Sequence, residues 1–348
     1  MADEGVAAVL VDFRSDTLTR PSPAMRAAMA SAEVGDDVFD EDPTLHELQE
    51  YVAGLFGHEA ALFCPSGTMA NQIALQLAVA RGGELLCDAA AHVVTDEIGA
   101  AAAIGGVSTR TWPSAGADLD PAVVADMIRP DGFVAVPTRA VAVEQTHNRQ
   151  GGAVIPLAAL ETLRGTTTAA GVHLHCDGAR IWHAHVADGV PLAAYGALFD
   201  SLSVCLSKGL GAPVGSLIVG SAARIATARK LRKRMGGGMR QAGILAAAGL
   251  YALRNNIARL ADDHARARRL ADALSPSGVV DPAKIRTNIV PLDLSAAPVD
   301  GPAFAAAARE EGILVSVLGR RLVRLVTHLD QTDDGIDHAA KVLPTLIG

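Results

Sequence analysis

Short apolar runs recur along the first two thirds of this 348-residue sequence, and each one ends abruptly in a polar or glycine-rich turn. They have the length of buried strands, and most contain β-branched residues. The runs cover 61–64, 84–87, 140–143, 172–176 and 202–206. Segments with a helical spacing of apolar residues accompany them, and an alanine- and glycine-rich helix is expected near 96–105. Strands that alternate with helices predict an α/β fold with a mostly parallel sheet, because parallel strands need long crossover connections.

The pattern changes in the last third of the sequence. A long helix is predicted from Gln241 toward Leu274, and the shorter elements beyond it predict a small α+β domain. The expected strands lie near 285–294, 313–317 and 321–327, and the expected helices near 301–311 and 332–346. We therefore expect three parts, which are an N-terminal segment (1–20), a large domain (21–255) and a small C-terminal domain (256–348).

Composition and charge exclude several classes of protein. The formal net charge of −8 argues against a nucleic-acid-binding surface. No apolar run is long enough to span a bilayer, and the acidic start of the sequence lacks a signal-peptide pattern. The four cysteines are single and none forms a CxxC pair, so we expect buried thiols in the cytoplasm and no metal site.

Three charged residues follow two of the predicted strands. Asp177 and Arg180 come after the run 172–176, and Lys208 comes after the run 202–206, 31 residues beyond Asp177. The carboxyl ends of strands in such sheets form the ligand-binding edge. A lysine that is partly desolvated there becomes a nucleophile, although a single lysine at a strand end more often lies in solvent.

A turn of small polar residues, Ser66-Gly67-Thr68, joins the run 61–64 to a predicted helix. Free amides and the helix dipole make such a turn an anion site, and the alternative is an ordinary helix cap without a ligand. His92 and His147 each follow a strand-length run as well, and a purely structural histidine is the alternative for both.

Pyridoxal phosphate needs three functions of this kind, namely an anion site for its phosphate, an acid for its ring nitrogen and a lysine for its aldehyde. The sequence resembles the low-specificity L-threonine aldolases, which are members of the β-eliminating lyase group of fold type I pyridoxal-phosphate enzymes. The resemblance covers almost the whole length. Its motifs are Phe13-Arg14-Ser15-Asp16-Thr17, Gly35-Asp36-Asp37-Val38, Ser66-Gly67-Thr68-Met69-Ala70-Asn71, Thr146-His147-Asn148, Asp177-Gly178-Ala179-Arg180, Leu206-Ser207-Lys208-Gly209, Gly236-Gly237-Gly238-Met239-Arg240-Gln241 and Arg324-Leu325-Val326-Thr327-His328-Leu329-Asp330.

The resemblance implies an aspartate-aminotransferase-like large domain with a mostly parallel seven-stranded sheet, and an N-terminal segment that contributes to the active site. It also implies residues for pyridoxal 5'-phosphate. Lys208 matches the Schiff-base lysine, Asp177 the partner of the ring nitrogen, and His92 the imidazole on the ring face. The remaining cofactor-side matches are Ser66, Gly67, Thr68 and Arg180, with Lys233 or Arg240 as phosphate-side cations that a neighbouring subunit could supply.

The resemblance also implies residues for a substrate. Ser15, Arg180 and Arg324 match the groups that hold the substrate carboxylate, which suits the planar fork of arginine. His147 matches the imidazole near the substrate hydroxyl. The base for that hydroxyl is then His147, His92 or a water that they hold.

The implied activity is cleavage of L-threonine, L-allo-threonine and related β-hydroxy-α-amino acids to glycine and an aldehyde, a reversible carbon–carbon lyase reaction. The implied assembly is a homotetramer, a dimer of dimers. One alternative is β-elimination, racemisation or transamination on the same scaffold. Another is a non-catalytic cofactor-binding protein, against which the presence of Lys208 and Asp177 argues.

The sequence departs from the family pattern in two places. Phe39 and Asp40 stand where many relatives have tyrosine and glycine. The turn after His92 reads Val93-Val94-Thr95-Asp96-Glu97 where many relatives are rich in aromatic residues. That turn lies near the substrate β-carbon in the family, so the departure bears on side-chain preference.

Overall fold

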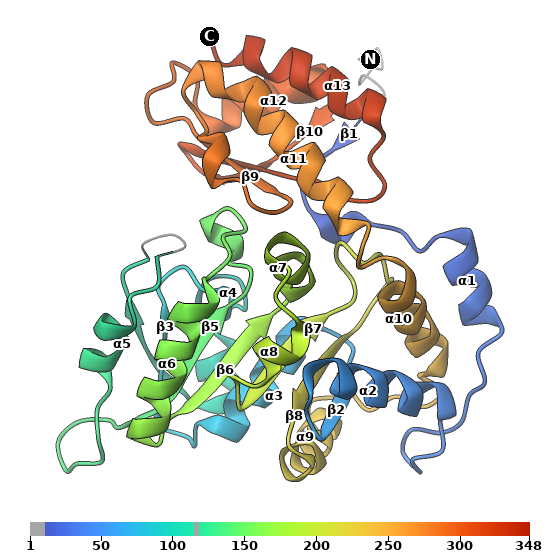
Figure 1. The fold of residues 1–348 in the computed structure, drawn as a ribbon, viewed down its shortest axis with the longest axis vertical. Coiled ribbons are helices and arrows are strands. Elements are labelled where there is room, and N and C mark those ends of the chain that lie inside the picture. The colour runs from blue at the N-terminus through green and yellow to red at the C-terminus, as the bar shows by residue number, and fades with distance from the viewer. Residues whose placement is uncertain (1–10, 115–117) are drawn as a thin grey trace, which may run out of the picture.

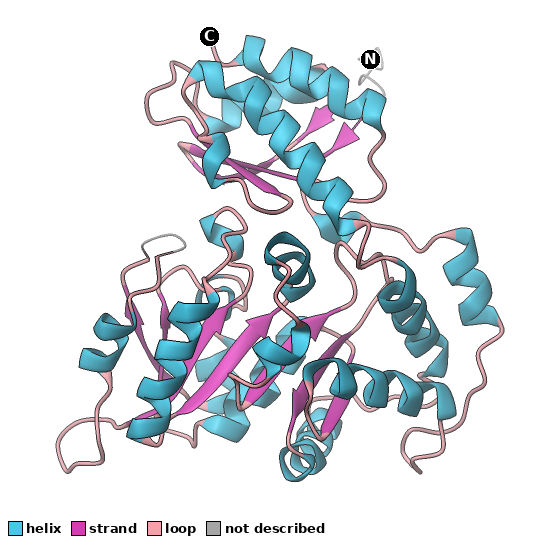
Figure 2. Cartoon of the chain, in the orientation of Figure 1, coloured by secondary structure: helices cyan, strands magenta, loops and turns pink. Residues whose placement is uncertain are grey.

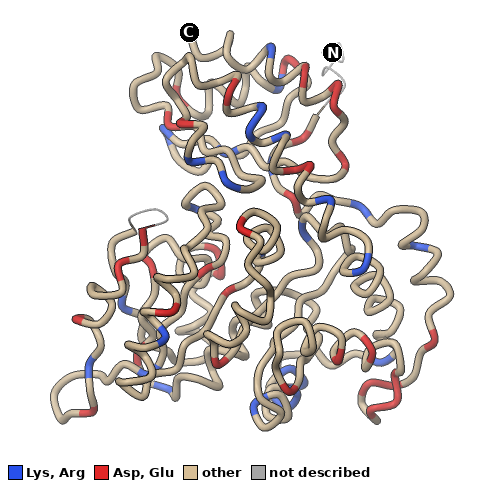
Figure 3. The backbone as a smooth tube through the Cα atoms, in the orientation of Figure 1, with Lys and Arg blue, Asp and Glu red and all other residues tan. Residues whose placement is uncertain are grey.

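The computed structural model describes residues 11–114 and 118–348. Figure 1 shows a large body of helices around a central sheet, with a smaller body formed by the last part of the chain. Within the described ranges, no helix is both long and apolar enough to cross a membrane. Basic and acidic positions are interspersed along both bodies (Figure 3).

The large body is built on a seven-stranded sheet with the strand order β2-β8-β7-β6-β5-β3-β4. Neighbours from β7 to β4 run parallel, while β8 is antiparallel to both β2 and β7. This confirms the predicted mostly parallel sheet. The strands are β2 (Ala60–Cys64), β3 (Glu84–Asp88), β4 (Ser108–Trp112), β5 (Thr138–Glu144), β6 (His173–Gly178), β7 (Ser201–Cys205) and β8 (Ser216–Gly220).

Helices surround this sheet (Figure 2). Several begin at a side-chain cap; for example, the Asp42 side chain accepts from the amide of Leu45 and Pro43 is the first residue of α2. The helices are α1 (Pro23–Ala30), α2 (Pro43–Phe56), α3 (Gly67–Ala78), α4 (His92–Thr95), α5 (Pro121–Met127), α6 (Leu157–Ala170), α7 (Ile181–Asp188), α8 (Leu192–Gly196), α9 (Ala222–Arg234) and α10 (Gly243–Asn255).

Both faces of the sheet are buried, which explains why its strands read as continuous apolar runs. Alternate residues of β2 enter different cores. Leu62 packs in a cluster with Ile73 of α3 and Ala228 of α9. Phe63 belongs to the larger cluster that includes Leu48 of α2. The two-residue period of a strand therefore serves two helical layers at once.

The small body has a three-stranded antiparallel sheet with the order β11-β12-β9. Its strands and helices are β9 (Ile289–Asp293), β10 (Ile313–Leu314), β11 (Ser316–Gly319), β12 (Leu322–Val326), α11 (Leu260–Leu274), α12 (Gly301–Glu310) and α13 (Asp333–Val342). The N-terminal strand β1 (Val11–Asp12) pairs in parallel with β10, and Phe13 is buried in the same core. The start of the described chain is thus part of the C-terminal body.

Two predicted helices differ from the structure. The single helix expected from Gln241 to Leu274 is interrupted at 256–259, between α10 and α11. At the interruption, the side chains of Asn256 and Arg259 donate to the carbonyl oxygens of Leu210 and Gly209, at 2.7 and 3.4 Å. The break therefore contacts the loop after Lys208. It lies beside the expected domain limit at 255, and the three domain limits stay a prediction.

The helix expected near 96–105 is also wrong in extent. Only a single π-helical turn forms, at Ala101–Gly105. Ile98 and Gly99 before it both have left-handed backbone conformations, with φ of 53° and 67°. A β-branched residue rarely adopts this conformation, and two such residues in succession cannot continue a right-handed helix.

Candidate active site

The carboxyl ends of β6 and β7 place the predicted acid and lysine at one edge of the sheet. These strands are parallel neighbours, and Asp177 is in register with Ser203. Strand β7 ends at Cys205, three residues before Lys208. The backbone carbonyl of Lys208 accepts from the Thr19 hydroxyl at 2.8 Å, which ties its loop to the N-terminal segment.

One cavity at this edge is lined by residues from distant parts of the chain. Five of them are predicted site residues, namely Ser15, His92, Arg180, Lys208 and Arg324. The other lining residues are Thr17, Asp96, Asn148, Arg149 and Leu318. The cavity therefore joins the N-terminal segment, the sheet edge and β12 of the small body, as the resemblance implies.

Asp177 is 4% exposed and lies within a hydrogen-bonded network. Its carboxylate accepts from the Asn71 amide at 2.7 Å and from the backbone amide of Ala179 at 3.1 Å. The Asn71 amide also donates to Glu97, at 2.7 Å. A buried carboxylate at this edge has the right chemistry to hold a protonated ring nitrogen.

His92 begins α4, and its orientation is set by a residue that the sequence did not identify. Glu97 accepts from Nδ1 of His92 at 2.8 Å and from the Gln72 amide at 2.6 Å, with its own side chain fully buried. Burial would lower the pKa of His92, but the bond to Glu97 and the nearby Asp177 raise it above its ordinary value. A histidine that donates from Nδ1 keeps Nε2 as an acceptor.

The predicted anion turn is a true helix start. Ser66 caps α3 by accepting from the amide of Met69, so the earlier amides of the first turn remain available for a ligand. A Cβ at Gly67 would lie 2.9 Å from Sγ of Cys205, closer than real Cβ contacts. Only glycine lets α3 pack this tightly against the end of β7, and this packing brings the helix start next to the Lys208 loop.

Arg180 forms an ion pair with Asp16, which is identified from the sequence only as part of a motif. Asp16 is fully buried and binds Nε and Nη2 of Arg180 at 2.8 and 2.7 Å. Burial alone would raise the pKa of Asp16, but the Arg180 guanidinium lowers it well below its usual range. Nη1 is the guanidinium nitrogen of Arg180 that does not bind Asp16, and it donates to Asn148 at 3.3 Å.

Arg324 has the environment of an anion-binding arginine. Its Nη1 donates to Asn148 at 2.7 Å and its Nη2 to the carbonyl of Arg14 at 3.2 Å, both neutral acceptors. Its Nε is buried without a hydrogen-bond partner in the described chain. Burial, reinforced by the charge of Arg180, lowers the pKa of Arg324 to about 10. A half-buried guanidinium whose hydrogen bonds go to neutral acceptors favours binding of a carboxylate.

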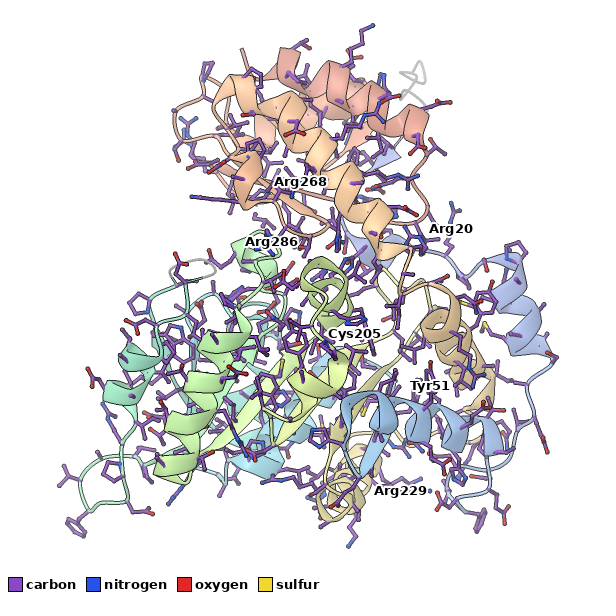
Figure 4. All side chains as sticks on the ribbon, viewed as in Figure 1. Arg20, Tyr51, Cys205, Arg229, Arg268 and Arg286 are labelled. Carbon is purple, nitrogen blue, oxygen red and sulfur yellow. The ribbon has the colours of Figure 1, made fainter. Side chains whose placement is uncertain are left out.

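Asp177 and the turn at 66–68 do not line this cavity, and three further predicted residues lie elsewhere. His147 lines a separate cavity with Asp88, where its Nε2 lies 3.4 Å from the Asp88 carboxylate. Lys233 lines a third cavity, on α9, and Arg240 pairs with Asp36 at 3.7 Å. Arg229, on the same helix as Lys233, lies far from Cys205 at the end of β7 (Figure 4). The roles of these three residues stay predictions.

Comparison with known proteins identifies the family of this chain. The sequence model of the β-eliminating lyase family matches residues 12–297. The low specificity L-threonine aldolase of Escherichia coli is 42% identical over 332 residues, which is 95% of this chain and 97% of that protein. Low-specificity L-threonine aldolase 1 of Arabidopsis thaliana is 41% identical, over 94% of both chains.

Solved structures show the same fold at lower identity. The Leishmania major threonine aldolase has a TM-score of 0.83 and 21% identity, covering 97% of this chain and 99% of that one. The Sphingomonas wittichii serine palmitoyltransferase has a TM-score of 0.73 and 15% identity, covering 99% and 91%. By its sequence this chain belongs to the β-eliminating lyase family and, within it, to the low-specificity L-threonine aldolases.

Proposed function

We propose that this protein binds pyridoxal 5'-phosphate through Lys208 and cleaves L-threonine, L-allo-threonine and related β-hydroxy-α-amino acids to glycine and an aldehyde. The observation that carries the proposal is the single cavity in which Lys208, His92 and the carboxylate-binding residues Ser15, Arg180 and Arg324 meet. An amino acid has the size and charge to be held by such a set.

The residues present fit the cofactor. Lys208 would hold its aldehyde carbon and Asp177 its ring nitrogen, while the start of α3, from Ser66 to Thr68, would hold its phosphate. The tight cradle at Gly67 and the buried carboxylate of Asp177 support this assignment. When bound, pyridoxal phosphate supplies an electron sink for the bond that breaks.

The protein orients the substrate. Arg324 provides a half-buried positive charge whose Nε has no hydrogen-bond partner among the described residues, and Ser15 and Arg180 lie in the same cavity. Arg180 is already paired with Asp16, so we assign the main carboxylate contact to Arg324 and a supporting one to Arg180. Fixing the carboxylate in this way aligns the Cα–Cβ bond for cleavage.

His92 is our choice for the base. Glu97 holds its Nδ1, so Nε2 can accept the proton of the β-hydroxyl as the Cα–Cβ bond breaks. General-base assistance of this kind contributes about 10²–10⁴-fold to the rate. His147 sits in another cavity and remains the second candidate.

The test is an absorbance spectrum followed by an assay. Purified protein should absorb as a bound pyridoxal Schiff base, and borohydride should fix the label on the Lys208 peptide. L-Threonine should then yield acetaldehyde and glycine in equal amounts. Formation of 2-oxobutanoate, D-allo-threonine or 3-hydroxy-2-oxobutanoate instead of acetaldehyde would assign β-elimination, racemisation or transamination on this scaffold.

We further propose a homotetramer arranged as a dimer of dimers, with Lys233 or Arg240 reaching a neighbour's phosphate site. Neither residue lines the cavity of its own chain that contains Lys208, which supports a contact with another chain. Sedimentation at assay concentration should give a tetramer, and an active monomer would refute it. We also propose a cytoplasmic location, because all four cysteines are free and buried, and cell fractionation would test it.

A further inference from the structure

One wall of the cavity has no role in the proposed reaction. After the carboxylate-binding residues, Lys208 and His92 are accounted for, the remaining charged lining residues are Asp96 and Arg149. Arg149 binds the carboxylate through two bonds, from Nε at 2.9 Å and from Nη2 at 2.6 Å. A salt bridge therefore forms part of the cavity surface.

The position of this pair follows from its neighbours in the chain. Asp96 ends the turn that begins at His92, and Arg149 directly follows Asn148, which contacts Arg324. In the proposed binding mode, Arg324 holds the substrate carboxylate and His92 contacts the β-hydroxyl. The remaining substituent on Cβ then has no contact assigned to it. The wall that joins these two sites, made by Asp96 and Arg149, is the surface that this substituent meets.

The two turns have a second anchor besides the pair. The Glu144 carboxylate, at the end of β5, accepts from the backbone amides of His92 and Asn148, each at 2.9 Å. A buried side chain therefore anchors both turns, independently of the bonds between Asp96 and Arg149. The side chains of the pair remain about 30% exposed, Arg149 at 30% and Asp96 at 29%.

The pair also keeps hydrogen-bonding capacity for a ligand. Its two bonds use Nε and Nη2 of Arg149, which leaves Nη1 without a recorded partner among the described residues. Asp96 accepts from Arg149 and from the Thr95 hydroxyl, and two oxygens can accept about four bonds in all. The guanidinium lowers the pKa of Asp96 to about 2, so the carboxylate is charged across the neutral range.

We propose that the Asp96–Arg149 pair selects the substrate side chain and favours β-hydroxy-α-amino acids that carry a further hydroxyl on the γ-carbon over those with an aryl group. This proposal rests on the proposed function. A hydroxyl can donate to Asp96 and accept from Arg149, replacing the water that leaves. An aryl group displaces the same water but cannot form hydrogen bonds to Asp96 and Arg149. Polar groups left without hydrogen bonds are the reason why polar sites discriminate strongly against apolar substrates.

The first test compares rates. In the wild-type holoenzyme, kcat/KM for 2-amino-3,4-dihydroxybutanoate should be at least about ten times that for β-phenylserine. This ratio is smaller than that of a fully buried polar site. Asp96→Ala and Arg149→Ala should each reduce this ratio by about tenfold, mainly through KM of the dihydroxy substrate, while L-threonine cleavage falls less. Asp96→Asn, which keeps an acceptor, should recover part of the ratio.

The second test measures binding without turnover. L-Homoserine and L-2-aminobutyrate differ only by the γ-hydroxyl, so calorimetry with the holoenzyme should give a lower Kd for L-homoserine. Asp96→Ala and Arg149→Ala should remove that difference. Arg139→Ala is the matched control, because Arg139 pairs with Asp131 in an exposed salt bridge outside the cavity and should leave both tests unchanged.

The outcomes separate the two proposals. A protein that releases no acetaldehyde from L-threonine refutes the proposed function. A protein that cleaves L-threonine but shows equal losses for all substrates in Asp96→Ala and Arg149→Ala uses the pair only structurally, which overturns this inference alone. A preference for β-phenylserine that disappears in Arg149→Ala also overturns it, because the guanidinium would then be a stacking surface for the ring.

Discussion

The Nδ1 atom of His92 lies 2.8 Å from a carboxylate oxygen of Glu97, whose side chain is fully buried. The same oxygen accepts from Asn71, and the other accepts from Gln72. Glu97 is thus fixed from three sides, and it fixes the ring of His92 in turn. This arrangement makes Glu97 a positioning residue for the proposed base.

Glu97→Gln should move the pH dependence of the reaction. The bond to Glu97 raises the pKa of His92, and a base must be unprotonated to act, so the acid limb of kcat/KM follows that pKa. Removing the charge lowers the pKa, and the acid limb should shift to lower pH while the plateau falls because the ring is less well oriented. An unchanged acid limb would show that His92 is not the base that this limb reports.

Arg324→Ala should reduce kcat/KM for L-threonine while the cofactor absorbance and the melting temperature stay close to wild type. Losing one desolvated charge pair costs about 2–5 kcal/mol, or roughly 30- to several-thousand-fold in rate. Arg324→Lys should recover only part, because an ammonium lacks the planar fork. The control is Arg321→Ala, since Arg321 bonds only backbone carbonyls and should affect stability more than activity. Near-normal activity of Arg324→Ala would move the carboxylate contact to Arg180 and Ser15.

Asp16→Asn should destabilise the fold in a pH-dependent way. Removing one partner of a buried ion pair costs about 3–5 kcal/mol at neutral pH. The pKa of Asp16 is lowered in the folded state, so its contribution is complete above the unfolded value and is lost as the pH falls below about 4. Urea unfolding should give equal losses at pH 7 and pH 5 and a smaller one near pH 3. Asp12→Asn, which breaks the more exposed pair with Arg14, should cost about 1 kcal/mol or less, and equal costs would contradict the assignment.

Gly67→Ala should weaken cofactor binding. The added Cβ would meet Sγ of Cys205 at 2.9 Å, so the start of α3 must move away from the Lys208 loop. Titration of the apoprotein should show at least about a tenfold increase in Kd, since a displacement that costs 1.4 kcal/mol suffices for this. The double variant Gly67→Ala with Cys205→Ala should restore affinity, because the sulfur is gone. Gly165→Ala, at an open position in α6, should have no effect on binding, and a rescue that fails would exclude the contact as the cause.

The sheet edge could be predicted from sequence because its signals are local. One strand-length run stands directly before Asp177 and another shortly before Lys208. Each run can be recognised from adjacent residues alone. The parallel sheet then brings their ends together. The same reasoning located the capped start of α3. The loss of the helix expected near 96–105 could not be predicted, because the left-handed backbone at Ile98 contradicts the preference of a β-branched residue.

The supporting residues could not be predicted because their partners are far away in the chain. Asp16 meets Arg180 across 164 positions, and Asn71 meets Asp177 across 106. No spacing rule relates such residues. Their only signal was membership in the motifs that carried the family resemblance, as with Asn148 in Thr146-His147-Asn148. His147 shows the converse, since its motif was clear but its side chain faces a different cavity.

The pairing of β1 with β10 has a consequence for the order of synthesis. Val11 aligns with Ile313, and Phe13 is buried in the core of the C-terminal body. Ser15 and Asp16 are synthesised long before the strands β10 and β12 that hold them in place. The large sheet can form during translation, but the binding cavity closes only when β1 has paired with β10. A nascent chain halted before residue 313 would therefore hold Lys208 and Asp177 in place and still lack the carboxylate site.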